Sequence, residues 1–296
     1  MSLSISVSPK SSENLRGILW MTLAMALFAL EDALVKRAAE SMPSGQMILS
    51  FGLGGALVFL WAVIARGEPV FAAVGSSVMR LRMVLEILGR MFYFLALALT
   101  PLSSTTAILQ ATPLVVVAGA AIFFGERVAI ARWIAIGIGL FGVLIILQPS
   151  GEQFSPLSFL AVLGMMGFAG RDLASRAAPM SLSTFVLGFY GFVAVMISGL
   201  LVSGWSREAY VVPETVASVA LIAGIAVGVC AYIALMQAMR TGEVSVVTPF
   251  RYSRLIFGVS LGYFVFAEPL SSSFWFGSFV VVAAGLSLML QGPKRH

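Results

Sequence analysis

The sequence predicts an all-α membrane protein with ten transmembrane helices, arranged as two inverted five-helix repeats around a central cavity. Of its 296 residues, 59% are hydrophobic and only 10% are charged. A soluble domain carries about 25% charged residues, because water must wet its surface. One membrane span needs ~20 consecutive apolar residues, so a chain of this length accommodates roughly ten spans and no sizeable soluble domain.

Ten apolar runs, separated by short polar breaks, provide the expected spans. The breaks contain turn-forming sequences such as Met42-Pro43-Ser44-Gly45 and Gln148-Pro149-Ser150-Gly151. Residues 1–13 are polar and Ser-rich and lack the features of a secretory signal, so we expect a disordered cytoplasmic tail. The expected spans are residues 15–36, 44–65, 80–99, 103–124, 128–147, 156–177, 182–203, 216–239, 244–266 and 272–291.

The distribution of Lys and Arg predicts the orientation of these spans. With a cytoplasmic N-terminus, the cytoplasmic segments hold eleven of the 18 basic residues, whereas the outer segments hold only Lys36, Arg37 and Arg207. Basic loops face the cytoplasm in multi-pass proteins. We therefore expect a bacterial inner (plasma) membrane protein with both termini in the cytoplasm. The net charge of +5 is attributed to these loops, and no nucleic-acid partner is expected.

A weak internal repeat divides the chain. Residues 85–133 align without gaps to residues 227–275, so that Glu126 matches Glu268 and Trp133 matches Trp275. Five spans per copy is an odd number, so the second copy must be inverted relative to the first. Inverted repeats around a midplane site are typical of secondary transporters. The expected domains are a five-helix repeat over residues 14–148 and a second over residues 155–291.

Several short motifs follow a recognisable pattern along the chain. They are residues 89–97, Pro113, Gly125-Glu126-Arg127, Trp133, Gly137-Ile138-Gly139, Ala267-Glu268-Pro269 and Trp275. These motifs make the chain similar to the EamA-type drug/metabolite transporter superfamily. The resemblance implies a ten-helix carrier of amino acids, nucleotide precursors or drugs, often an exporter, and the chain resembles bacterial aromatic amino acid exporters. Two features depart from the superfamily pattern: residues 46–54 lack an arginine common in the second helix, and Leu255 stands opposite Pro113 in the repeat.

Charged residues inside the expected spans need an explanation, because each costs ~2.5–3.5 kcal/mol on insertion scales. One interpretation is neutral ion pairing between helices. The other is a hydrated cavity in which arginine binds a carboxylate of the substrate. Glu31 and Asp32 are expected to be neutralised by Lys36 and Arg37. The remaining charged residues are Glu86, Arg90, Arg171, Asp172, Arg251 and Arg254, with Arg82, Glu86 and Arg90 on one face of their helix.

Uncharged polar and aromatic residues complete the expected substrate cavity. Arginine beside an aromatic ring suits a zwitterion with a flat side chain. Pro113 and Pro249 are expected hinges, because proline removes a backbone hydrogen bond. Adjacent Arg171 and Asp172 are expected to need separate partners, since neighbouring helical residues point about 100° apart. The uncharged candidates are Trp20, Tyr93, Gln110, Tyr232, Gln237 and Tyr252.

These observations favour a monomeric secondary transporter that exports small organic metabolites, above all aromatic or neutral amino acids, by alternating access. Nucleosides or cationic drugs as substrates, and a passive channel, remain alternatives, as do exchange, uniport and proton coupling. The only cysteine is Cys230 and the only histidine is His296. We therefore expect no metal site, no cofactor and no enzymatic activity, and a membrane enzyme is the weakest rival.

Overall fold

The computed structural model describes residues 9–71, 77–125, 129–147, 155–176, 183–241 and 247–290, which contain helices and no β-strand. This confirms the all-α class. The α-helices are α1 (Pro9–Ala39), α2 (Ser44–Ala65), α3 (Ser77–Leu99), α4 (Leu102–Leu109), α5 (Thr112–Phe124), α6 (Ile130–Leu147), α7 (Phe159–Arg176), α8 (Thr184–Ser206), α9 (Thr215–Arg240), α11 (Ser253–Phe266) and α12 (Ser272–Leu290). Two 3₁₀ segments, η1 (Pro156–Ser158) and η2 (Thr248–Tyr252), precede α7 and α11.

Helix length and composition confirm a multi-pass membrane protein. Within the described ranges, six helical stretches are long and apolar enough to cross a bilayer, and α6 and α12 contain shorter apolar segments. Helix α3 has 23 residues but carries Arg80, Arg82, Glu86 and Arg90, which make it less apolar. The six stretches are Ser12–Ala39, Ser44–Ala65, Leu102–Phe123, Pro156–Ala174, Thr184–Ser206 and Thr215–Arg240.

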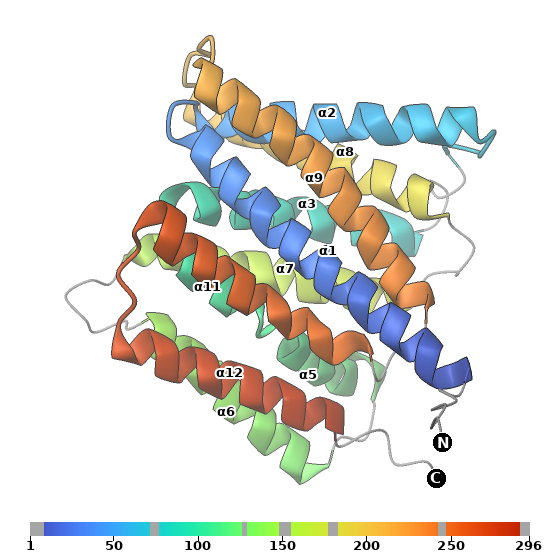
Figure 1. Ribbon diagram of the computed structural model, residues 1–296, viewed down its shortest axis with the longest axis vertical. Coiled ribbons are helices and arrows are strands. Elements are labelled where there is room, and N and C mark those ends of the chain that lie inside the picture. Colours follow the sequence, from blue (N-terminus) through green and yellow to red (C-terminus); the bar gives the residue numbers. More distant parts are fainter. Residues whose placement is uncertain are drawn as a thin grey trace, which may run out of the picture.

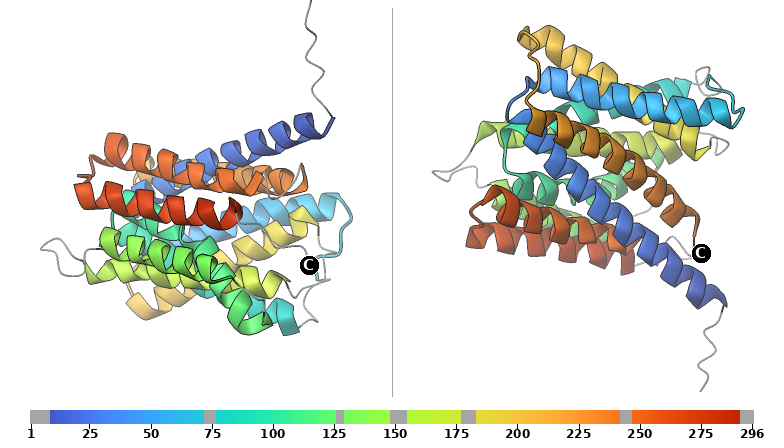
Figure 2. Two further views of the ribbon diagram at one scale, coloured as in Figure 1. Left: turned by 90° about the horizontal axis from the view of Figure 1, so that it is seen from below. Right: turned by 45° about the horizontal axis from the view of Figure 1, so that its top comes forward.

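The helices pair across the middle of the chain rather than along it. Helix α1 packs on α9, α2 on α8, α3 on α7, α4 on α11 and α6 on α12 (Figure 1). When the two halves are exchanged, the α1–α9 pair becomes the α7–α3 pair, and the α2–α8 and α6–α12 pairs map onto themselves. This pattern indicates two structurally equivalent halves. Figure 2 shows the paired helices as a bundle more than one helix deep.

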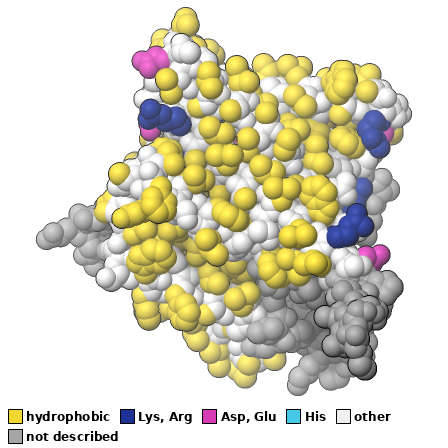
Figure 3. All heavy atoms as spheres, viewed as in Figure 1, with side chains coloured by type: hydrophobic (Ala, Val, Ile, Leu, Met, Phe, Trp, Pro, Cys, Tyr) yellow, Lys and Arg dark blue, Asp and Glu magenta, His cyan; other side chains and the backbone are white. Residues whose placement is uncertain are grey.

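Apolar side chains cover the outside of this bundle. In Figure 3, one face is broadly hydrophobic, and the visible charged side chains lie toward its edges. Trp61 is 72% exposed and Phe264 is 80% exposed. A protein with such an apolar surface would aggregate in water, whereas lipid tails solvate this surface in a membrane. In Figure 1, the start of α1 and the end of α12 lie at the same end of the bundle.

A cluster of aromatic rings fills the centre between α2, α3, α8 and α9. The Phe51 ring lies 5.4 Å from the ring of Phe94 and 5.5 Å from that of Phe192, measured between centroids. Phe59 continues the cluster, 5.6 Å from both Phe192 and Tyr232. These tilted and edge-on arrangements are the favourable geometries for aromatic pairs. The cluster joins helices of both halves.

One expectation about an individual element is wrong. The expected tail includes Pro9–Glu13, which are helical and open α1, because proline is tolerated in the first turn of a helix; residues 1–8 lie outside the described ranges.

The expected fourth span agrees with the stretch Leu102–Phe123, which is long and apolar enough to cross a bilayer. Its helix is interrupted at Gln110 and Ala111, just before Pro113, and the N–H groups of these two residues bond to carbonyls three residues back. Pro113 follows in the first turn of α5 and cannot donate to that ladder.

Helices α2 and α8 approach so closely that only glycine fits between them. A Cβ atom at Gly52 would lie 2.2 Å from the backbone nitrogen of Met196. We expect Gly52→Val to cost several kcal/mol or to prevent folding, because backbone atoms cannot move aside as a side chain can. Thermal unfolding in detergent measures this. Gly137→Val is the matched control, since a Cβ there meets nothing within 4 Å. Equal stability of both variants would contradict the prediction.

Candidate functional site

Helix α3 presents a row of charged side chains toward the middle of the bundle. The Glu86 carboxylate lies 3.4 Å from Nη2 of Arg82 and 3.9 Å from Nε of Arg90. The four-residue spacing seen in the sequence thus places both arginines on the same carboxylate. Glu86 itself is 2% exposed. Its negative charge is therefore held inside the protein by cations of its own helix.

Helix α7 adds a third arginine to Glu86. Nη1 of Arg171 donates to Oε1 of Glu86 at 3.4 Å, and Nε and Nη2 donate to Oδ1 of Asp172 at 2.9 and 2.8 Å. The expectation that Arg171 and Asp172 need separate partners is therefore wrong. The long arginine side chain turns back to its neighbour and still reaches across to α3.

An aromatic ring lies beneath two of these arginines. The guanidinium carbons of Arg90 and Arg171 lie 5.6 and 5.1 Å from the ring centroid of Phe168. Cations over an aromatic face are attracted by its quadrupole. Phe168 was not among the sequence candidates. Its position three residues before Arg171 in the sequence, one helical turn away, was the available signal.

A second group of buried charges joins the two halves. Nη2 of Arg254, on α11, donates to Oδ2 of Asp32 at 2.6 Å and lies 2.9 Å from the hydroxyl of Tyr93. Tyr93 donates to the same Asp32 oxygen at 2.8 Å. Asp32 is 1% exposed, so the pair is shielded from water. This charged triad consists of Asp32 on α1, Tyr93 on α3 and Arg254 on α11.

The expected neutralisation of Glu31 and Asp32 by Lys36 and Arg37 is wrong. Lys36 instead donates to the carbonyl oxygens of Thr100 at 2.6 Å and Leu97 at 3.3 Å. Arg37 pairs with Glu40 at the exposed end of α1. Residues four apart on a helix can meet, but here the partner of Asp32 comes from a helix more than two hundred residues away. Sequence spacing contains no information on such a contact.

Arg251 has a different environment from the other arginines. Its backbone carbonyl accepts a hydrogen bond from Nε2 of Gln110 at 3.2 Å, which connects η2 with the break between α4 and α5. Its guanidinium makes no hydrogen bond or ion pair with a described residue. The neighbouring hydroxyl of Tyr252 is buried and likewise has no partner among these residues.

The remaining sequence candidates differ in position. Trp20 is 38% exposed on α1, and Gln237 is exposed on α9. Tyr232 is buried beside Phe59 in the aromatic cluster and interacts electrostatically with Glu86 and with the arginines around it. Pro113 is the second residue of α5, and Pro249 is the second residue of the 3₁₀ segment η2.

Glu268 connects the halves at the start of α4. Its carboxylate accepts the backbone N–H of Leu102 at 2.6 Å and that of Ser103 at 2.9 Å. Nζ of Lys36 lies 3.9 Å from the same carboxylate. The first N–H groups of a helix have no partner within the helix, and an anion satisfies them well. Glu126, its counterpart in the first repeat, lies outside the described residues.

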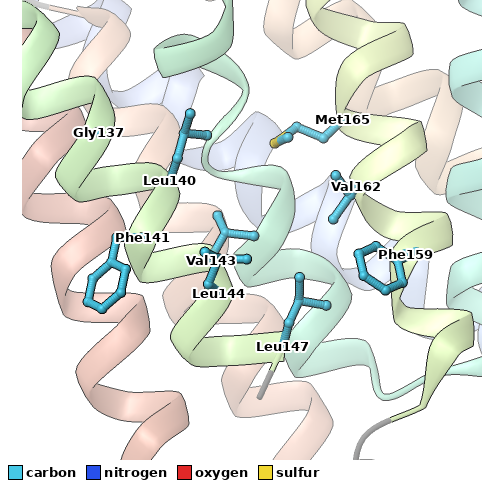
Figure 4. A pocket seen from close by; sticks show the side chains of 9 residues that line it. All are labelled: Gly137, Leu140, Phe141, Val143, Leu144, Leu147, Phe159, Val162 and Met165. Atoms are coloured by element: carbon cyan, nitrogen blue, oxygen red, sulfur yellow. The ribbon is translucent and has the colours of Figure 1, made fainter. Parts of the chain in front are cut away.

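An apolar crevice of about 410 Å³ separates α6 from α7. Figure 4 shows its lining side chains, which include Leu140, Val143 and Leu147 on α6 and Val162 and Met165 on α7. None of the lining residues is charged, so this crevice offers no partner for an ionised substrate. Among the described residues, no group of three or more His, Cys, Asp or Glu could hold a metal ion.

Comparisons with known proteins give the same class of molecule. The chain is 26% identical over 276 residues to the pseudopaline exporter of Pseudomonas aeruginosa, covering 92% of this chain and 95% of the relative. It is 22% identical over 280 residues to the S-adenosylmethionine uptake transporter of Rickettsia conorii (95% and 94%). It is 26% identical over 308 residues to the riboflavin transporter of Rhizobium johnstonii (99% and 96%).

A solved crystal structure shares the fold, with a TM-score of 0.59 and 22% identity, covering 96% of this chain and all of the other. The EamA-like transporter family matches the sequence twice, over residues 15–148 and 156–290. The boundary between the two matches falls between α6 and η1. The chain belongs to the EamA-like transporter family.

Proposed function

We propose that this protein is a secondary transporter that exports amino acids, with aromatic and neutral ones preferred, by alternating access. The family and the relatives support a transporter of small metabolites in a membrane. The proposal includes ten spans in two inverted halves, residues 14–148 and 155–291, in a bacterial inner membrane. Both termini lie in the cytoplasm, and the monomer is the working unit.

The observation that carries the proposal is an excess of positive charge in one buried group. The guanidinium cluster, which we define as Arg82, Arg90, Arg171 and Arg251 with Glu86 and Asp172, contains four cations and two anions among the described residues. Arg251 belongs to it through its electrostatic interaction with Asp172 and Arg171. Burying excess charge in a membrane protein is costly unless water or a ligand compensates it. A substrate carboxylate would supply negative charge. Arginine suits this role because its planar fork matches a carboxylate.

Within this cluster, Arg251 is the strongest candidate to bind the substrate. Its guanidinium makes no hydrogen bond or ion pair with a described residue, so binding a carboxylate breaks no existing ion pair. Phe168 is already the aromatic surface on which Arg90 and Arg171 lie. An aromatic amino acid would place its carboxylate at Arg251 and its flat side group toward Phe168. The positive excess disfavours cationic drugs, one of the two alternative substrate classes; nucleosides are the other.

Each half contains an irregular backbone segment, and this feature supports alternating access. The break at Gln110 and the 3₁₀ segment η2 lie at corresponding places in the repeat and are joined by the bond from Gln110 to Arg251. Discontinuous helices at a midplane site are a recurring feature of secondary transporters. We assign hinge roles to Pro113, which follows the break at Gln110, and to Pro249, which lies within η2.

The test is counterflow of labelled L-phenylalanine in proteoliposomes. Wild-type protein is expected to show saturable counterflow, and Arg251→Ala to reduce it by about 10- to 100-fold, since one charge-assisted hydrogen-bonded contact contributes ~1.5–3 kcal/mol. Arg251→Lys should recover little, because lysine lacks the fork. Arg240→Ala, at the exposed end of α9, is the matched control.

Two outcomes would contradict the proposal. Flux that rises linearly with phenylalanine concentration, without counterflow, would indicate a passive channel. Unchanged counterflow in Arg251→Ala would remove Arg251 from the substrate site. Because Arg251 has no described partner, its variant should fold normally, and its melting temperature should match that of wild-type protein.

A further inference from the structure

We propose that Glu31 is a proton-binding site that couples substrate movement to the proton gradient. This inference rests on the proposed function, because coupling requires a transporter. The proposed function does not specify whether transport is driven by exchange, by the substrate gradient alone or by protons. Glu31 belongs neither to the guanidinium cluster nor to the charged triad.

The environment of Glu31 favours its neutral form. The side chain is 3% exposed, and its Oε2 atom has no hydrogen-bond partner among the described residues. Gly228 of α9 lies directly against it: a Cβ atom there would be 3.1 Å from the Glu31 carboxyl carbon and 3.1 Å from the Phe51 ring. An unpaired carboxylate in such apolar surroundings is strongly disfavoured. A bound proton removes that cost.

The charged groups around Glu31 do not neutralise it. From its own helix comes Asp32, a like charge; from α3 come Arg90 and Tyr93, and from α11 comes Arg254. Arg254 and Tyr93 are both bonded to Asp32. Arg90 lies at the Glu86 carboxylate. Two adjacent carboxylates repel each other, and only Asp32 is bonded directly to a guanidinium. We therefore expect Asp32 to stay ionised and Glu31 to bind the proton.

The position of Glu31 connects its proton to the movement of the halves. Its helix, α1, belongs to the first half, whereas Gly228 on α9 and Arg254 on α11 belong to the second. Rocking of one half against the other would change the surroundings of Glu31, either admitting water or bringing a guanidinium closer. Either change stabilises the carboxylate and releases the proton. Per cycle, one proton binds from one side and leaves to the other, and only the O–H bond of the carboxyl forms and breaks.

A substrate-free experiment tests proton binding directly. Infrared spectra of purified wild-type protein at neutral pH are expected to contain the C=O stretch of a protonated carboxyl group, which Glu31→Gln should remove. Glu40→Gln is the matched control, because Glu40 lies just beyond the same helix, is about half exposed and pairs with Arg37. An identical carboxyl band in Glu31→Gln and wild-type protein, or no such band in wild-type protein, would overturn the proposal.

A transport experiment tests coupling. In proteoliposomes loaded with a pH-sensitive dye, an imposed pH gradient is expected to drive accumulation of labelled L-phenylalanine by wild-type protein and by Glu40→Gln. In Glu31→Gln this accumulation should fall to the level measured without a gradient, while counterflow continues. Accumulation by Glu31→Gln equal to that of wild-type protein would exclude this role of Glu31. Absence of counterflow in wild-type protein would instead refute the proposed function.

Discussion

Replacement of Arg254 by alanine is expected to destabilise the protein by about 3–5 kcal/mol, because it leaves the Asp32 charge buried without its cation. Asp32 is 1% exposed and bonds to Arg254 at 2.6 Å. After the substitution only the Tyr93 hydroxyl would still donate to it. Thermal or denaturant unfolding in detergent measures the loss.

A compensating substitution distinguishes a buried charge from lost packing. Adding Asp32→Asn to Arg254→Ala removes the uncompensated charge and should recover a large part of the loss, since neighbouring sites are not additive. Arg37→Ala is the matched control: Arg37 also pairs with a glutamate, but 52% of its side chain is exposed, so we expect less than ~1 kcal/mol. A double variant less stable than Arg254→Ala alone would contradict this explanation.

Replacement of Glu268 by alanine is also expected to lower the free energy of unfolding substantially. It would leave the N–H groups of Leu102 and Ser103 without their acceptor at a buried helix start. Hydrogen bonds to a charged group contribute ~1.5–3 kcal/mol each, so we expect a loss of about 3–5 kcal/mol. Glu268→Gln keeps one acceptor oxygen and should lose less. Because the contact joins the two halves, phenylalanine counterflow should slow as well.

A second glutamate at a helix start offers the control for Glu268. Glu214 precedes α9 but makes no side-chain bond to it and is exposed. Glu214→Ala should therefore change the unfolding midpoint very little. If Glu268→Ala and Glu214→Ala melt together, capping by Glu268 does not contribute to stability.

Helix identity followed from composition and local spacing. The continuous apolar runs predict helices because a bilayer requires every backbone group to be bonded within its own segment. The i, i+4 spacing of Arg82, Glu86 and Arg90 predicts their contact for the same local reason, and the ion pairs are present. The repeat, read from Glu126 and Glu268 among others, agrees with two family matches along the chain.

Other features could not be read from spacing. Pro113 indicated an irregular fourth span, but the bond from Gln110 to the backbone of Arg251 depends on how α4 and η2 pack. The sequence also predicted the wrong ion-pair partners for Asp32 and for Arg171. A long side chain pairs with whichever opposite charge it can reach, whether on a distant helix, as Arg254 reaches Asp32, or at the next residue, as Arg171 reaches Asp172.

The amino-acid sequence alone determined the membrane class, most helix positions, the duplication and the residue types available for a charged site. Those properties depend on hydrophobicity and on contacts within one or two helical turns. Only the tertiary structure decided that Arg254 belongs to Asp32, that Glu268 caps α4, that Arg251 keeps a guanidinium without a described partner and that Glu31 is enclosed by Gly228. Each of these contacts joins segments far apart in sequence, and their energies depend on burial, which exists only after the helices have packed.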